Sequence, residues 1–235
     1  MAPSDSISLR RMLYELREVT VPLPGGGRIG PISWMLERGR RVRVATASDA
    51  QWQAFVALLT GEQHAATGTL EEVATVTVQT DTHLRESLNL NRSLEEYLNS
   101  PDMPELIMLD GRRRSLWVLL DVLGISPHMT RRALKYAAPE LIDKVWALRF
   151  MLSRASLLIG RDLFRLTDEG IHAALRRRWS DLTGAVVVGE TEQPLPGPVQ
   201  EWVRFDGDGG FTSGREAGAD DATGRPPGDA EPDDA

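Results

Sequence analysis

Residues 116–137, LWVLLDVLGISPHMTRRALKYA, decide how the sequence is interpreted, because an apolar helical run meets Gly-Ile-Ser and then a second helical pattern. Gly124 tolerates the positive φ that a tight turn between two helices needs. Ser126 can cap the second helix, and Pro127 suits its first position. This arrangement is typical of a helix-turn-helix, whose second helix lies in the major groove of DNA.

The second half of the stretch would supply the contacts to DNA. The polar and basic side chains that we expect to face bases or phosphates are Ser126, His128, Thr130, Arg131, Arg132 and Lys135. We expect backbone contacts from three arginines at the start of the first helix, Arg112, Arg113 and Arg114. A pair of core helices joined by a glycine turn has the same spacing, so both interpretations stay open on spacing alone.

The charge distribution is uneven along the 235 residues, which carry a net charge of −7. Residues 206–235 hold nine acids and two bases, whereas residues 111–178 hold 14 basic and six acidic side chains. A basic segment of this kind attracts a phosphate backbone. Arginines that only solvate helix surfaces would produce the same count, and charge alone does not separate the two explanations.

Several kinds of functional site have no counterpart in the sequence. There is no cysteine, which excludes disulfides, thiolate metal ligands and cysteine nucleophiles. The four histidines are far apart and lack metal-ligand spacing, and GxSxG is absent. Gly25, Gly27 and Gly30 match GxGxxG, but prolines flank them instead of a strand and a helix. We therefore predict no enzyme activity, no catalytic residue, no metal and no cofactor.

The location of the protein follows from similar observations. The N-terminus lacks the uninterrupted apolar core of a signal peptide. The most apolar stretch, residues 141–159, contains four charged side chains and should not span a membrane. We predict a cytoplasmic protein with no membrane partner.

Hydrophobic periodicity predicts the secondary structure of the first hundred residues. The spacing of apolar residues predicts a short amphipathic helix over 8–19. Alternation predicts a strand over 40–48, and Ser48 can cap a helix over 49–60. The β-branched residues of 73–79 predict a second strand. This strand-helix-strand order indicates a small α/β unit.

The remainder of the chain is predicted to be helical. Residues 82–99 indicate a surface helix or helix pair, and every element after residue 115 is expected to be a helix. Residues 206–235 are poor in large apolar groups and are expected to be disordered. The predicted fold is an α-rich α/β protein with a strand-helix-strand region, an all-helical helix-turn-helix region and a disordered acidic tail. The predicted domains are 1–100, which is α/β, 101–184, which is helical and basic, and 185–235, which is extended and ends in the tail.

Two segments resemble the ParB partition-protein family. LRESLNLNRSLEEYL (84–98) is similar to that family's "ENLxR…LxxxEEA" segment, and LGISPHMTRRAL (123–134) is similar to the opening of its helix-turn-helix. The resemblance covers roughly residues 32–140 and implies DNA binding in plasmid partition. It departs at the family's nucleotide-binding loop, where this chain has ATASDAQ (45–51) without an arginine. Because Asp49 would repel phosphate, CTP binding is not carried over.

Two alternatives accompany this interpretation. RDLFRLTDEGIHAAL (161–175) resembles the wing-to-helix segment of winged-helix regulators, which are also DNA-binding proteins. A different class is a non-enzymatic protein-interaction or assembly module that uses an apolar helix at 140–159. The sequence as a whole predicts a sequence-specific DNA-binding protein, partition-like or a transcriptional regulator, that binds double-stranded DNA as a homodimer.

Overall fold

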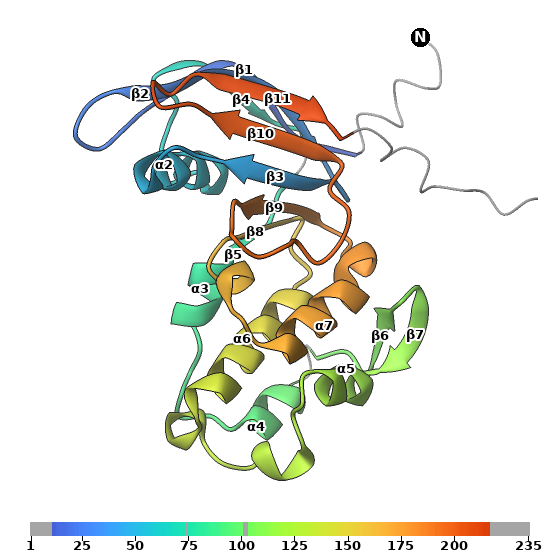
Figure 1. Ribbon diagram of the computed structural model, residues 1–235. Helices are drawn as coiled ribbons and strands as arrows, with labels where there is room; N and C mark the ends of the chain where they lie inside the picture. Colours follow the sequence, from blue (N-terminus) through green and yellow to red (C-terminus); the bar gives the residue numbers. More distant parts are fainter. Residues whose placement is uncertain (1–10, 74, 101–102, 217–235) are drawn as a thin grey trace, which may run out of the picture.

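The computed structural model describes residues 11–73, 75–100 and 103–216. Its upper part is built from two β-sheets with one helix between them, and its lower part is mainly helical (Figure 1). The smaller sheet is antiparallel, in the order β2-β1-β4. Its strands are β1 (Met12–Pro22), β2 (Arg28–Glu37) and β4 (Thr67–Glu72).

The larger sheet has six strands in the order β11-β10-β3-β9-β8-β5. All pairs are parallel except β10 with β11, which is antiparallel. The strands are β3 (Arg41–Ala45), β5 (Val78–Thr80), β8 (Leu157–Gly160), β9 (Ala185–Gly189), β10 (Glu201–Phe205) and β11 (Phe211–Arg215). The central strands β8 and β9 are buried along their whole length, as parallel strands covered on both faces are.

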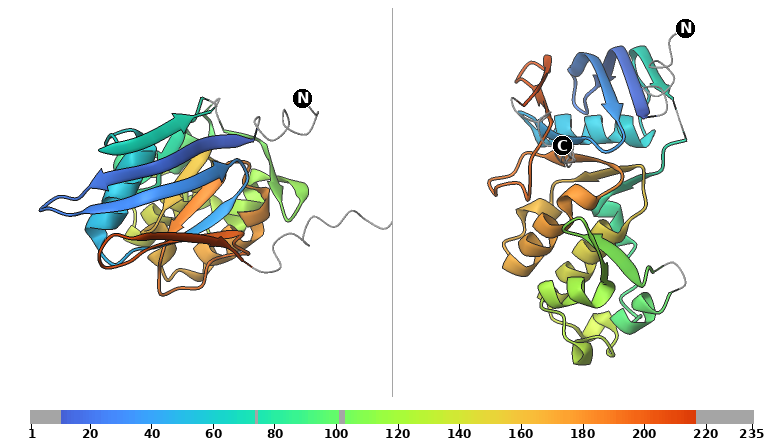
Figure 2. Two further views of the ribbon diagram at one scale, coloured as in Figure 1. Left: turned by 90° about the horizontal axis from the view of Figure 1, so that it is seen from above. Right: turned by 90° about the vertical axis from the view of Figure 1, so that its right-hand side faces the viewer.

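The two faces of the larger sheet belong to two separate hydrophobic cores. Along β9, Val186 and Val188 face the helical part, while Val187 packs with α2 (Asp49–Thr60) and the antiparallel sheet. This division follows from the alternation of side chains along a strand. Views from two further sides show the antiparallel sheet and the helices on opposite faces of the larger sheet (Figure 2).

The helical part combines short helices with one projecting β-hairpin. Its helices are α3 (Asp81–Glu86), α4 (Leu94–Leu98), α5 (Leu116–Val122), α6 (Pro139–Leu152) and α7 (Glu169–Arg178). The hairpin consists of β6 (Leu106–Leu109) and β7 (Arg112–Ser115). No helix among the described residues combines the length and the apolar character needed to cross a membrane.

Some sequence-based elements are confirmed. The helix over 49–60 is α2, and the Ser48 hydroxyl accepts a hydrogen bond from Gln51 N at its start. Gly61 ends it in the left-handed conformation, with φ 77°. The strand predicted over 40–48 corresponds to β3 (Arg41–Ala45). Of the strand predicted over 73–79, only residues 78 and 79 lie in a strand, at the start of β5.

The predicted fold class is wrong, because the region after residue 115 contains strands of the larger sheet. The runs LLIG and AVVVG are too short and too uniformly apolar to show a period, which is why the first was predicted as part of an apolar helix and the second only as an extended segment. The helix over 8–19 is also wrong, since the residues from Met12 onward belong to β1. Register shifts in β1 between Leu16 and Val19 interrupt its alternation, which explains the misleading spacing.

The predicted disorder of residues 206–235 is wrong where the structure describes them. Residues 206–210 form a turn that leads into β11, and Asp206 Oδ1 accepts hydrogen bonds from Asp208 N and Gly210 N. The polar composition of this segment is therefore that of a tight turn and an edge strand. Residues 217–235 lie outside the described residues.

Candidate functional site

The carboxyl ends of five parallel strands meet along one edge of the larger sheet. In open α/β sheets this edge is where ligands bind, at the point where the strand order reverses. After β3 the chain crosses to β5 at one edge of this sheet. The later strand β10 pairs with β3 on the side opposite to β9. The residues that follow the strands at this edge are Thr46, Asp81, Arg161, Glu190 and Asp206.

The connection from β3 to α2 is short and contains no glycine. Only residues 46–48 separate the strand from the helix. Gln51 is buried, and its Oε1 accepts a hydrogen bond from Ala47 N at 2.7 Å. The Gln51 amide donates to the Asp206 carbonyl at 2.6 Å, and its main-chain N–H donates to Ser48 Oγ. The main-chain N–H groups of Ala47 and Gln51 are thus engaged by the protein itself.

Arg161 closes the space next to this connection. Its side chain is only 14% exposed, and its Nη1 lies 2.8 Å from the carboxylate of Asp49 in the first turn of α2. The guanidinium also lies over the ring of Trp52, 5.5 Å from the centroid. The stem packs on Gly189, where an added Cβ would come within 2.8 Å of Arg161 Cγ. Helix α2 and strand β9 therefore fix this arginine, which follows β8, across the edge.

Asp81, which starts α3, anchors the loop that carries Arg161. It is 4% exposed, and its Oδ2 accepts hydrogen bonds from Arg161 N at 2.8 Å and Leu163 N at 2.9 Å. Its Oδ1 accepts from Thr82 N at 2.8 Å. Burial raises the pKa of the Asp81 carboxyl, and the N–H donors oppose that rise. This carboxylate joins the ends of β5 and β8.

A pocket of about 600 Å³ beside the end of β9 is acidic. Glu190 and Glu192 line it, against one cation, Arg165. Glu190 is itself paired with Arg43, with 3.2 Å between Oε1 and Nη2. Two carboxylates make this pocket unfavourable for phosphate groups. Among the described residues, no three His, Asp or Glu side chains are grouped so that they could hold a metal ion.

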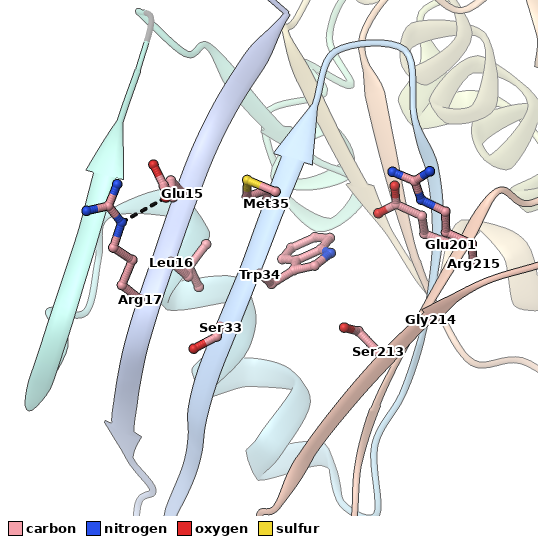
Figure 3. Close-up of a pocket in the computed structure, with 10 residues that line it drawn as sticks. All are labelled: Glu15, Leu16, Arg17, Ser33, Trp34, Met35, Glu201, Ser213, Gly214 and Arg215. Atoms are coloured by element: carbon pink, nitrogen blue, oxygen red, sulfur yellow. Dashed lines mark hydrogen bonds and ion pairs between the residues drawn. The ribbon is translucent and has the colours of Figure 1, made fainter. Parts of the chain in front are cut away.

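A second pocket, of about 430 Å³, lies between the edges of the two sheets (Figure 3). β2 and β11 meet at one end, where Gly30 N donates to Gly209 O at 2.8 Å, and the pocket opens beside them. Figure 3 shows Arg17 turned toward Glu15 on β1, with Glu201 and Arg215 at the opposite wall. The charges are mixed and the walls are open, so this pocket indicates no particular ligand.

The helix-turn-helix prediction for residues 116–137 is wrong. The first helix exists as α5, Gly124 has φ 66° and Ile125 is buried, as expected of the turn. The second helix does not form: residues 127–129 and 134–136 are single 3₁₀ turns. The intervening backbone bonds to the segment before α4 instead, with Leu134 N donating to Arg92 O at 2.9 Å.

The predicted contact residues are therefore not carried on one helix. Arg131, Arg132 and Lys135 are exposed on this irregular segment. Ser126 Oγ lies 3.1 Å from a ring nitrogen of His128, whereas Thr130 is buried and donates to Pro127 O at 2.7 Å. The three arginines expected at a helix start, Arg112, Arg113 and Arg114, form strand β7.

The apolar segment 140–159 is likewise not a free interaction helix. Residues 139–152 form α6, which contributes Trp146 and Phe150 to the core, and Leu157 already belongs to β8.

Sequence analysis noted Asp49 but missed Arg161 and Asp81. An isolated arginine after a short apolar run and an aspartate at a helix start carry no recognisable motif by themselves.

Comparisons with known proteins bear on the fold. No family model matches this chain. No curated protein matches it either. Among solved structures, a chain of a metal-chelate type ABC transporter in an inward-facing conformation matches with a TM-score of 0.60. The match covers 87% of this chain and 83% of the other at 13% identity. A likeness at that identity concerns the fold alone.

This likeness overturns the predicted function. A helix-turn-helix regulator or partition protein was expected, whereas the fold is similar to that of this transporter chain. The strands that build this fold include β8, whose residues were predicted to lie in an apolar helix, and β9, which lies in the segment predicted to be extended. The comparisons do not bear on the ParB resemblance itself, which stays untested.

Proposed function

We propose that this chain is a non-enzymatic subunit of an ABC-transporter-like assembly, with an ATPase-like fold that does not bind nucleoside triphosphates. The proposal rests on one observation at the carboxyl edge of the sheet. The connection after β3 is closed by the Asp49–Arg161 ion pair, with 2.8 Å between Oδ1 and Nη1. The link to transport comes from the similarity between the fold of this chain and that of the solved transporter chain.

The chemistry of phosphate binding explains why this connection is unsuitable. A P-loop, GxxxxGK[ST], uses free backbone N–H groups to cradle phosphates and a lysine to reach them. Residues 46–48, Thr-Ala-Ser, contain no glycine and no lysine. The helix N-terminus, which could attract an anion, already has the carboxylate of Asp49 beside it. A triphosphate would meet the negative charge of Asp49 at this turn, without the glycine loop and the lysine that hold phosphates in a P-loop.

A protein of this fold without the phosphate loop is suited to a binding or structural role beside other subunits. The absence of cysteine fits a reducing compartment, and we place the chain on the cytoplasmic side of the assembly. The assembly partner would be a membrane-embedded subunit. The chain should therefore co-purify in stoichiometric amount with a polytopic membrane protein when membranes are solubilised from its native cells.

Calorimetric titration of the purified chain with MgATP tests the nucleotide part of the proposal. We expect no saturable heat and no release of phosphate. An Asp49→Ala variant, which removes the repelling carboxylate, should also fail to bind because the turn still lacks the glycines and the lysine of a P-loop. Saturable ATP binding by the unaltered protein would refute the proposal. Recovery of the chain only from the soluble fraction, free of membrane proteins, would refute its subunit role.

A further inference from the structure

The β6–β7 hairpin projects from the helical part, beside α5 and α7 (Figure 1). Its register pairs Leu106 with Ser115 and Met108 with Arg113. Residues directly opposite each other share one face of a hairpin. This outer face therefore carries two large apolar side chains and a cation, while Ile107 and its neighbour Leu109 face the core. One face of the hairpin packs on the core through Ile107 and Leu109, and the other face exposes Leu106 and Met108 to solvent.

The apolar side chains of this region are unusually exposed. Leu106 is 56% exposed, Met108 is 39% exposed, and Trp117, in the first turn of α5 directly after the hairpin, is 53% exposed. They make up three of the seven large hydrophobic residues that are exposed in the described parts of the chain. Exposed apolar groups that gather in this way mark an interaction surface.

The cations of the hairpin are free to meet an external anion. The side chains of residues 112–114 are all exposed arginines, and none forms an ion pair with the described residues. The acid in the hairpin turn, Asp110, is already paired with Arg177 at 2.7 Å. Glu105 is exposed and offsets one of the three charges. The local balance is positive on a chain whose net charge is −7.

We propose that the hairpin surface docks on an anionic lipid headgroup surface. It is defined as Leu106, Met108, Arg113 and Trp117, together with Arg112 and Arg114, which lie on the opposite face by register but are also exposed. Arginines that attract lipid phosphates, beside aliphatic and indole groups that enter the acyl boundary, form the composition of an interfacial anchor. A protein partner would need about 20–30 residues on this side. The hairpin offers far fewer. This inference does not depend on the proposed subunit role, because protein-free vesicles suffice to test it.

Trp117 provides the readout for this test. Four of the other tryptophans are buried, among them Trp146 and Trp179, and Trp202, on β10 of the larger sheet, is half-buried. At low salt, vesicles of phosphatidylcholine with phosphatidylserine should therefore shift the tryptophan emission to the blue. The full chain should also co-sediment with these vesicles. Vesicles of phosphatidylcholine alone should do neither. The Trp117→Phe variant should lose most of the emission shift while it still sediments.

A charge-matched pair of variants locates the site. The first replaces Arg112, Arg113 and Arg114 by glutamine. The second removes the same charge elsewhere, by replacing Arg131, Arg132 and Lys135, which are also exposed. Each arginine near an anionic surface contributes roughly fivefold to binding, so the first variant should bind roughly a hundredfold more weakly. The second should retain at least most of the binding, and circular dichroism should show both variants folded.

Three results would overturn the proposal. The first is failure of the unaltered protein to bind phosphatidylserine vesicles at low salt. The second is equal loss of binding in the two charge variants, which would mean that the hairpin is not the site. The third is an equal emission shift with soluble polyglutamate in place of vesicles, which would assign the surface to an acidic protein.

Discussion

Replacing Asp81 by alanine should destabilise the whole protein, because one buried carboxylate holds the ends of β5 and β8 together. Its oxygens accept hydrogen bonds from Thr82 N, Arg161 N and Leu163 N, at 2.8, 2.8 and 2.9 Å. The carboxylate residue is 4% exposed, so water is poorly placed to replace the lost acceptor. Alanine removes the acceptor of the buried Leu163 donor and of the partly buried Arg161 donor, whereas Thr82 is exposed and its N–H can bond to water.

The size of the effect follows from the donors of Arg161 and Leu163. Each such donor left unsatisfied costs about 1–3 kcal/mol, which gives a total of at least about 2 kcal/mol. Asparagine keeps one carbonyl oxygen, which can still accept from Arg161 N and Leu163 N. Its amide would then face Thr82 N, so the Asp81→Asn variant should lose about 1–3 kcal/mol.

Equilibrium unfolding in urea, followed by circular dichroism, measures both variants against the unaltered protein. The urea concentration at the midpoint should be highest for the unaltered protein, lower for Asp81→Asn and lowest for Asp81→Ala. The slope of the transition should change little. A loss below about 1 kcal/mol for Asp81→Ala would refute the inference that this carboxylate joins β5 and β8. Equal losses for the two variants would show that the retained oxygen does not serve the Arg161 loop.

Three further predictions concern other buried contacts. Arg41 is 3% exposed and donates to the carbonyls of five residues, so Arg41→Met should reduce the free energy of unfolding by about 3 kcal/mol; a near-neutral result in urea unfolding would contradict this. Gly189→Ala should cost about 1–2 kcal/mol because its Cβ meets the stem of Arg161, and thermal unfolding should show it. Burial raises the pKa of Tyr14 to about 12. The unfolded chain therefore loses this phenolic proton first, and stability should fall as pH rises from about 10 toward 12; Tyr14→Phe should remove that part of the slope.

Sequence alone determined those elements whose signals are local. The helix α2 is one, because its Ser48 cap and its terminating Gly61 lie within or next to the segment they define. The turn at Gly124 and Ile125 is another, since a positive φ and one buried neighbour require only nearby residues. The unsuitability of residues 45–51 for phosphate was also apparent, from the charge of Asp49.

Tertiary structure decided the elements whose signals are ambiguous over a short range. Residues 127–136 can satisfy a helical pattern, yet their backbone bonds to Leu90 and Arg92 from a segment some 40 residues earlier. The runs LLIG and AVVVG fit either a buried helix or a buried strand. They become strands because each finds parallel neighbours on both sides, and no residue within the run specifies those neighbours.

The candidate site shows the same division. Asp49 was visible in the sequence, but its partner Arg161 is 112 residues away. Gly189, which makes room for the arginine stem, lies on a third strand. Local propensity acts through neighbours along the chain, whereas an ion pair across a sheet edge depends on the order in which strands assemble. The sequence by itself therefore determined that the turn after β3 lacks a phosphate loop, and only the assembled sheet decided that Arg161 occupies the adjacent space.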